Sequence, residues 1–230
     1  MVLVFASNNA HKLEEVRAIM PAGVEVLSLH DIGFEAEIEE TGTTLEANSL
    51  IKAEAVYQWI SNFKFQISNL FIDGVFADDT GLEIDALDGK PGVYTARWYL
   101  MNGERLKVKG ERDIFHANRA KALRELDGKE NRGAQFRTVI TLIRLEDGAS
   151  RLQNATLQVE GVVRGRIAEE EYGEGGFGYD PIFIPEGYDK TFGELPAEVK
   201  NGISHRARAL QALVKYLTAY YQHNDPIMTR

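Results

Sequence analysis

Apolar residues recur along this 230-residue chain at two spacings, which predict alternating strands and helices. Residues 2–6 form a short apolar run typical of a buried strand, and the polar residues 7–12 follow as a turn. Apolar positions then recur at helical spacing as far as Met20. Thr43-Thr44-Leu45-Glu46 has the pattern of a capping box and predicts a second helix that continues through Trp59.

The middle of the chain changes to the two-residue period of strands. Residues 75–77 predict a strand, residues 78–81 a turn, and residues 82–86 a second strand with alternating polarity. Lys90-Pro91-Gly92 predicts another turn, and residues 111–127 predict a helix.

The remaining elements predict the fold class. Residues 136–145 are apolar on both faces, which is typical of a central strand, and Asp147-Gly148 predicts a hairpin turn. A strand is expected near 157–163, and a last helix from Ser204. Interleaved strands and helices predict an α/β fold with a mixed sheet, because hairpins require antiparallel neighbours. Two segments without a clear pattern, 61–72 and 99–112, are expected to be surface elaborations.

Composition narrows the function classes. The formal net charge is -9, whereas proteins that follow a nucleic-acid backbone usually carry a basic face, so no nucleic-acid partner is expected. No apolar run approaches the ~20 residues of a membrane span. The chain has no cysteine, which excludes disulfides, thiolate metal sites and a cysteine nucleophile and fits a cytoplasmic location.

The segment Ser7-Asn8-Asn9-Ala10-His11-Lys12 stands where a strand leads into a helix. Free backbone N–H groups and the helix dipole favour anions there, and Lys12 supplies a full positive charge. The alternative is an asparagine-rich cap with a solvated lysine, since asparagine and serine prefer caps in any case.

Two pairs of adjacent acids are candidates for metal chemistry. Asp78 and Asp79 follow an apolar strand, and carboxylate oxygens suit Mg²⁺ or a general base. The alternative is a plain β-turn between two strands. Glu39 and Glu40 precede the second helix, and only one of two adjacent side chains in an extended segment can face a given site.

Two further segments could bind a polar ligand. Residues 173–181 contain G-x-G-x-x-G but no helix follows, so they predict a ligand loop with Phe177, Tyr179 and Asp180 rather than a dinucleotide fingerprint. An aromatic face there can stack on a base, or it can simply anchor the core. The segment 200–206 places cations in the first turn of the last helix, where they favour an anionic or polar ligand over a solvated turn.

Taken together, these segments resemble the inosine triphosphatase family, also called the Ham1-like nucleotide pyrophosphatases. Six segments carry the resemblance in the family's order: Ser7-x-Asn9-x-x-Lys12; Glu39-Glu40-Thr41-Gly42 with Asn48 and Lys52; Ala77-Asp78-Asp79-Thr80-Gly81-Leu82; Pro91-Gly92-Val93-Tyr94-Thr95-Ala96-Arg97; Gly175-Gly176-Phe177-Gly178-Tyr179-Asp180-Pro181; and Ser204-His205-Arg206. Asn8 departs from the pattern, because a glycine is common at that position in the family.

The resemblance implies one domain over residues 1–230, with an elongated mixed β-sheet, flanking helices and two lobes around a central cleft. It also implies a homodimer and Mg²⁺ as cofactor. The implied activity is hydrolysis of non-standard purine triphosphates such as ITP, dITP and XTP to the monophosphate and pyrophosphate. A Maf-like pyrophosphatase and a catalytically silent nucleotide sensor are the alternatives.

The resemblance also implies a role for each site residue. Asp79 binds the metal and is the base for the attacking water, and Glu39 (or Glu40) is the second metal acid. Phe177 stacks on the purine. The other expected substrate contacts are Ser7, Asn8, Asn9, Ala10, His11, Lys12 and Lys52 with the phosphates, Thr80 with the nucleotide, Gly178, Tyr179 and Asp180 around the base, and Lys200, His205 and Arg206 with base and phosphates.

Overall fold

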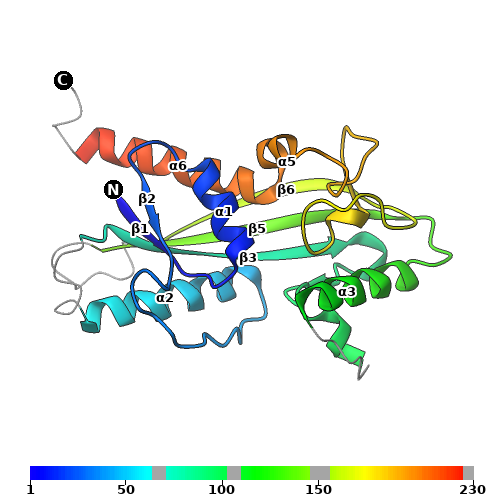
Figure 1. Ribbon diagram of the computed structural model, residues 1–230, viewed down its shortest axis with the longest axis horizontal. Helices are drawn as coiled ribbons and strands as arrows, with labels where there is room; N and C mark the ends of the chain where they lie inside the picture. Colours follow the sequence, from blue (N-terminus) through cyan, green and yellow to red (C-terminus); the bar gives the residue numbers. More distant parts are fainter. Residues whose placement is uncertain (64–70, 103–109, 146–155, 225–230) are drawn as a thin grey trace. The chain divides into compact units, whose positions relative to one another are not determined.

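A computed structural model of the chain describes residues 1–63, 71–102, 110–145 and 156–224. Its seven-stranded sheet has the order β2-β1-β3-β5-β6-β7, with β4 paired to β3 (Figure 1). The strands are β1 (Val2–Phe5), β2 (Glu25–Leu27), β3 (Gly74–Ile84), β4 (Pro91–Gly92), β5 (Gly133–Arg144), β6 (Thr156–Ile167) and β7 (Phe183–Pro185). Strand β1 runs parallel to β2 and β3, whereas the β3–β4 and β6–β7 pairs are antiparallel. The predicted α/β class with a mixed sheet is confirmed.

Five α-helices accompany the sheet in the described residues: α1 (Ala10–Ile19), α2 (Leu45–Phe63), α3 (Glu111–Glu125), α5 (Ala197–Ile203) and α6 (His205–Asn224). Helices α1, α2 and α3 were predicted with approximate bounds, and α6 was predicted from its start. Helix α5 and strand β2 were not predicted, because both are too short for a periodic pattern to emerge. Among the described residues, no helix has the length and apolar character that crossing a membrane requires.

Backbone contacts divide the chain into two compact units. The first unit comprises residues 1–79, 138–161 and 207–230, and the second comprises 80–137 and 162–206. Strands β3, β5 and β6 each contribute residues to both units.

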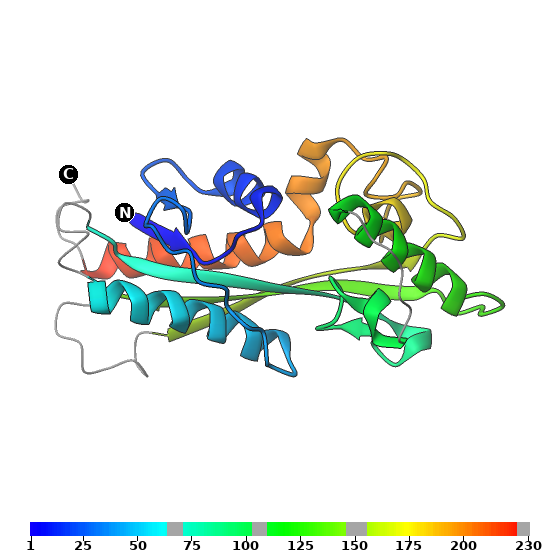
Figure 2. The same ribbon diagram turned by 60° about the horizontal axis from the view of Figure 1, so that its bottom comes forward.

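The alternating side chains of the strands determine the packing of the first unit. Leu3 and Phe5 of β1 pack in one cluster with residues of α1 and α6, and Val4 packs in another with residues of α2. Figure 2 accordingly shows α2 on the face of the sheet opposite to α1 and α6. A two-residue period in β1 thus meets helices on both faces, which explains why this strand is apolar throughout.

The second unit has a separate core. Leu82 and Ile84 of β3, Phe136 of β5 and Phe183 of β7 pack there with Leu126, which follows α3. Phe136 and Phe183 meet edge to face, with ring centroids 4.8 Å apart, a favoured geometry for aromatic pairs. This core supports the loop of residues 172–180, which lies between β6 and β7.

One prediction was wrong in a way that bears on the site. Residues 78–81 were expected to form a turn between two strands, but β3 continues through them from Gly74 to Ile84. Asp78 and Asp79 are buried within this strand, at 2% and 7% exposure. A strand can bury adjacent carboxylates only if opposite charges compensate them, and lysines from two helices do so.

The unpatterned segments are only partly described. Residues 61–63 complete α2, and 98–102 form a 3₁₀ turn. The other predicted elaborations at 64–70 and 103–109 lie outside the described residues, as does the predicted hairpin turn at Asp147-Gly148.

Candidate active site

In the first unit, helix α1 begins with a capped, open N-terminus. The Asn9 side chain accepts a hydrogen bond from the backbone N–H of Lys12 at 3.0 Å, and Ser7 Oγ accepts one from the Asn9 N–H at 3.3 Å. Ser7 is half-buried, whereas Asn8, Ala10 and His11 are exposed. This geometry agrees with both interpretations of the segment, since a cap and an anion site use the same helix end.

The two adjacent aspartates of β3 point to opposite faces of the sheet, as strand geometry requires. Asp78 has the parity of Phe76, which packs with α1, and its Oδ1 accepts a hydrogen bond from Lys12 Nζ at 2.8 Å. Asp79 has the parity of Ala77, which packs with α2, and its Oδ1 lies 2.9 Å from Lys52 Nζ. Each carboxylate therefore meets a lysine from the helix on its own face.

Lys52 joins a third acid to this group. Its Nζ also lies 2.8 Å from Glu40 Oε1, so one ammonium bridges Glu40 and Asp79. Glu39 is exposed. The structure thus brings Glu40, not Glu39, into the charged group, as expected if only one of two adjacent acids can face the site.

Burial changes the proton affinity of this group. Burial raises the pKa of Asp79, and the nearby charges of Lys52 and Lys12 offset that rise only in part. Burial also works against ionisation of Lys52, but Asp79, Asp78 and Glu40 outweigh it and raise the pKa of the ammonium. A carboxylate with a raised pKa is a better proton acceptor than an exposed aspartate, which suits a general base.

Asn48 is a residue of this group whose role the sequence did not define. Its Nδ2 donates to Asp79 Oδ2 at 3.3 Å, and its Oδ1 accepts a hydrogen bond from the Gly42 N–H at 2.8 Å. A Cβ on Gly42 would lie only 2.6 Å from that oxygen, so this approach requires glycine. One fully buried amide therefore holds both the loop after Glu40 and the carboxylate of Asp79.

The oxygen atoms of this group suit a hard divalent cation. Glu40 and Asp79 converge on a single positive charge, the Lys52 ammonium. Among the described residues, no group of three or more acidic, histidine or cysteine side chains could hold a metal ion. Mg²⁺ commonly binds one or two carboxylates and takes its other ligands from water and substrate phosphates, so Glu40 and Asp79 fit that pattern.

In the second unit, the glycine loop presents an aromatic ring. Gly176 and Gly178 have φ values of 72° and 63°, which favour glycine. A Cβ on Gly176 would also collide with the Asp180 carboxylate. Asp180 Oδ2 accepts hydrogen bonds from the Phe177 N–H and from Lys200 Nζ, both at 2.8 Å. The loop is therefore tightly constrained around Phe177.

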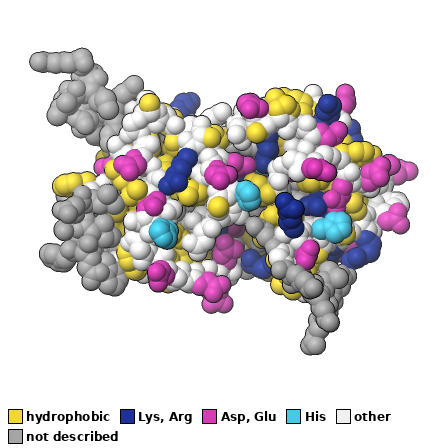
Figure 3. Space-filling view, viewed as in Figure 1, with side chains coloured by type: hydrophobic (Ala, Val, Ile, Leu, Met, Phe, Trp, Pro, Cys, Tyr) yellow, Lys and Arg dark blue, Asp and Glu magenta, His cyan; other side chains and the backbone are white. Residues whose placement is uncertain are grey.

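Two buried cations lie against the Phe177 ring. Lys200 Nζ is 4.7 Å and Arg206 Cζ 5.6 Å from the ring centroid, within the range of cation–π contacts. They are 6% and 2% exposed, so the basic turn expected at 200–206 is buried rather than solvated. By contrast, acidic and basic side chains are interspersed over the molecular face in Figure 3.

Three other predicted site residues, His205, Tyr179 and Thr80, differ in burial and in their contacts. His205 is buried and stacks on Phe136, with ring centroids 4.6 Å apart. Tyr179 lies in the core of the second unit, donates to the Thr95 carbonyl at 3.1 Å, and has a pKa raised by burial. Thr80 is half-buried at the end of the acidic pair. Of these, Tyr179 has the contacts of a structural residue.

Known proteins are similar to nearly the whole chain. The sequence model described as Ham1 family matches residues 3–216. A dITP/XTP pyrophosphatase of Bacillus subtilis is 45% identical over 219 residues, which are 94% of this chain and 96% of that protein. The dITP/XTP pyrophosphatase of Flavobacterium johnsoniae is 43% identical, covering 95% of this chain and 99% of its own. The solved structure of the Staphylococcus aureus Ham1 protein has a TM-score of 0.75 at 35% identity, covering 96% of this chain and 100% of that one.

Proposed function

Because this chain belongs to the Ham1 family, we propose that it hydrolyses non-standard purine nucleoside triphosphates such as dITP, ITP and XTP to the monophosphate and pyrophosphate. Curated relatives that match over 94% or more of this chain bear the name dITP/XTP pyrophosphatase. The protein is accordingly a hydrolase of the nucleotide pool. The observation that carries the proposal is the charged group of the buried Asp78, Asp79 and Lys52 and the half-buried Lys12 next to the capped start of α1.

This charged group supports recognition of a polyphosphate. A triphosphate carries several negative charges that must be neutralised before water can attack. Lys12, Lys52 and the N–H groups at the start of α1 supply positive charge, with Ser7, Asn8, Asn9, Ala10 and His11 in the same segment. Without substrate the lysines pair with Asp78 and Asp79, and we propose that phosphate oxygens take part of that pairing.

Asp79 is our candidate for the general base. Its carboxylate would accept the proton of the attacking water. A divalent cation such as Mg²⁺, when bound, would neutralise charge on the phosphates, and Glu40 and Asp79 are the acids we assign to it. Asn48 would hold Asp79 in orientation. None of these steps requires a covalent nucleophile.

The second unit supports recognition of the base. The constrained Phe177 ring offers a surface on which a purine can stack. Hypoxanthine and xanthine carry an acceptor oxygen at C6, where adenine carries an amino donor. Arg206, Lys200 and the backbone N–H groups of the loop can donate to that oxygen, whereas adenine would leave such donors unpaired. Selectivity of up to ~10⁴-fold is attainable from hydrogen bonds of this kind.

Several finer proposals rest on the family resemblance. They are Mg²⁺ as the physiological cation, a homodimer, a cytoplasmic location, and small-molecule substrates without a nucleic-acid partner. The absence of cysteine from the chain supports a reducing compartment.

A pyrophosphate-release screen across nucleoside triphosphates tests the proposed function. With Mg²⁺, we expect ITP, dITP and XTP to be hydrolysed much faster than ATP, with pyrophosphate as the first product. Equal rates on ATP would contradict the selectivity, and orthophosphate as the first product would contradict the reaction. Tight nucleotide binding without turnover would instead indicate a sensor.

A further inference from the structure

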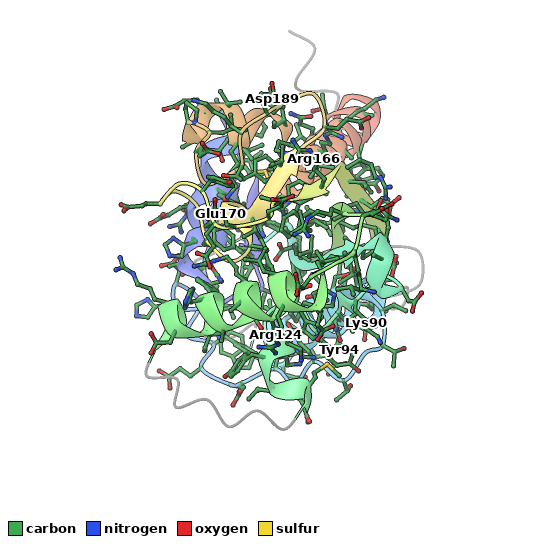
Figure 4. The ribbon with its side chains drawn as sticks, turned by 90° about the vertical axis from the view of Figure 1, so that its right-hand side faces the viewer. Lys90, Tyr94, Arg124, Arg166, Glu170 and Asp189 are labelled. Atoms are coloured by element: carbon green, nitrogen blue, oxygen red, sulfur yellow. The ribbon has the colours of Figure 1, made fainter. Side chains whose placement is uncertain are left out.

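Helix α3 contacts the loop that carries Phe177 through an arginine that none of the six family-like segments contains. Arg119 Nη1 donates to the carbonyl of Gly178 at 2.8 Å, and Nη2 lies 2.9 Å from Glu171 Oε2. Figure 4 shows α3 below the loop beside which Glu170, the neighbour of Glu171, is labelled. One guanidinium thus joins α3 to residue 171, just before the loop, and to residue 178 within it.

The contact continues on both sides of the arginine. His116 Nδ1 lies 3.1 Å from Glu171 Oε1, so Glu171 is held by two side chains of α3. The Phe115 ring lies 6.4 Å from the Phe177 ring, measured between centroids. Burial opposes ionisation of Glu171, but Arg119 and His116 outweigh it and lower its pKa. The carboxylate that anchors Arg119 is therefore charged at neutral pH.

The loop carbonyl that Arg119 binds is a sensitive point. Gly178 follows Phe177 directly and has a positive φ of 63°, so a contact that fixes its carbonyl restrains the backbone next to the ring. Asp180 and Lys200 hold the N–H side of Phe177, and Arg119 holds the carbonyl side of Gly178. The buried Nε of Arg119 has no acceptor among the described residues. The contacts of the guanidinium with Gly178 and Glu171 are therefore made by Nη1 and Nη2.

We propose that Arg119, anchored by Glu171, is a positioning residue that sets the orientation of the Phe177 ring and thereby the affinity for the purine base. This inference rests on the proposed function. Arg119 acts through the Gly178 carbonyl and not by touching the nucleotide. Gly176 and Gly178 give the loop a flexible backbone, so the contacts of Asp180 on one side of Phe177 and of Arg119 on the other act together to restrain it.

Steady-state kinetics of Arg119→Met, Arg119→Lys and the control Arg112→Met test the proposal. Methionine keeps an unbranched, flexible stem but loses the charged fork, so we expect KM for ITP to rise about tenfold, as for the loss of a charged hydrogen bond. We expect kcat to stay within about twofold, because the catalytic acids are untouched. Lysine supplies a point charge in place of the fork and should restore KM in part. Arg112 is an exposed arginine of the same helix, and its variant should match the wild type.

Binding measurements separate a positioning role from a general structural one. Calorimetry should show weaker binding of IMP to Arg119→Met, while product inhibition by inorganic pyrophosphate stays unchanged. Should Arg119→Met fail to fold, Glu171→Gln replaces it, since the amide keeps the shape and weakens the anchor. A rise in KM of about two- to threefold is expected there.

The outcomes distinguish this inference from the function on which it rests. A wild-type protein that hydrolyses none of the triphosphates contradicts the proposed function. An active wild type with unchanged KM and IMP binding in folded Arg119→Met and Glu171→Gln overturns the role of Arg119. Equal weakening of IMP and pyrophosphate binding also overturns it, because a general disturbance of structure would have that effect.

Discussion

The two units carry chemically different groups, and each is buried for a different reason. In the first unit, the carboxylates of Asp78 and Asp79 can be buried because lysines of α1 and α2 pair with them. In the second unit, the central group is the Phe177 ring, with Lys200 and Arg206 against it. Paired charges suit a polyphosphate and water attack, whereas a ring flanked by cations suits a flat polar base. We therefore expect changes in the first unit to affect kcat and changes in the second to affect KM.

The largest effect is expected from Asp79→Asn, which removes the proposed base. We predict a fall in kcat of roughly 10²–10⁴-fold. Because burial raises the pKa of Asp79 in the folded protein, ionised Asp79 costs stability once the pH is above that pKa. The neutral amide of the variant avoids this cost but removes one of the two acids that pair with Lys52, and Glu40 remains, so the melting temperature at pH 7 should change little.

Stopped assays with ITP and thermal melts measure both quantities. Asp88→Asn is the matched control, since Asp88 is exposed and asparagine tolerates its left-handed backbone. Near-normal turnover in Asp79→Asn would show that another group is the base.

An intermediate effect is expected from Asn48→Ala, which releases Asp79 and the Gly42 backbone together. A small displacement of a catalytic group can reduce the rate by up to ~10²-fold, and we predict a loss in kcat of that order with a smaller change in KM. Gln58→Ala, at an exposed amide of the same helix, should have no effect. A change confined to KM would contradict this prediction and show that Asn48 acts in substrate binding and not in orienting Asp79.

The third effect is expected from Phe177→Ala, and on KM rather than kcat. Stacking of an aromatic side chain on a base is worth about 1–3 kcal/mol, so KM for ITP should rise about 5- to 150-fold. Phe177→Tyr should restore binding, and Phe71→Ala, at a phenylalanine that is 91% exposed, is the control. Unchanged KM in Phe177→Ala, or a loss mainly in kcat, would contradict the division of roles between the units.

Local patterns predicted much of the fold. Helices α1, α2, α3 and α6 have apolar periods or caps that a short segment contains by itself, β1 is a continuous apolar run, and β5 carries apolar residues on both faces. The acidic pair was the main failure. Asp78 and Asp79 have a strong turn preference when only local sequence is considered, yet Lys12 and Lys52 stabilise them inside β3 from 66 and 27 residues away. No local propensity contains such a distant compensating charge.

The candidate site was predicted with similar limits. The resemblance picked out Asp79, Lys12 and Phe177 but left open whether Glu39 or Glu40 is the second acid, and the contact of Glu40 with Lys52 now favours Glu40. Arg119 gave no signal, because an arginine in an amphipathic helix usually faces solvent. Its role depends on contacts with residues 171 and 178, more than 50 positions further along the chain.

The sequence by itself determined the α/β class, the family and the residue types that we propose for the chemistry, because these depend on periodicity and on motifs that stand in order. The tertiary structure alone decided that adjacent aspartates face opposite sides of one strand and meet different helices, that Glu40 shares an ammonium with Asp79, and that α3 restrains the Phe177 loop. The physical reason is that a buried charge is stable only beside its partner, and folding brings such partners together from distant parts of the chain.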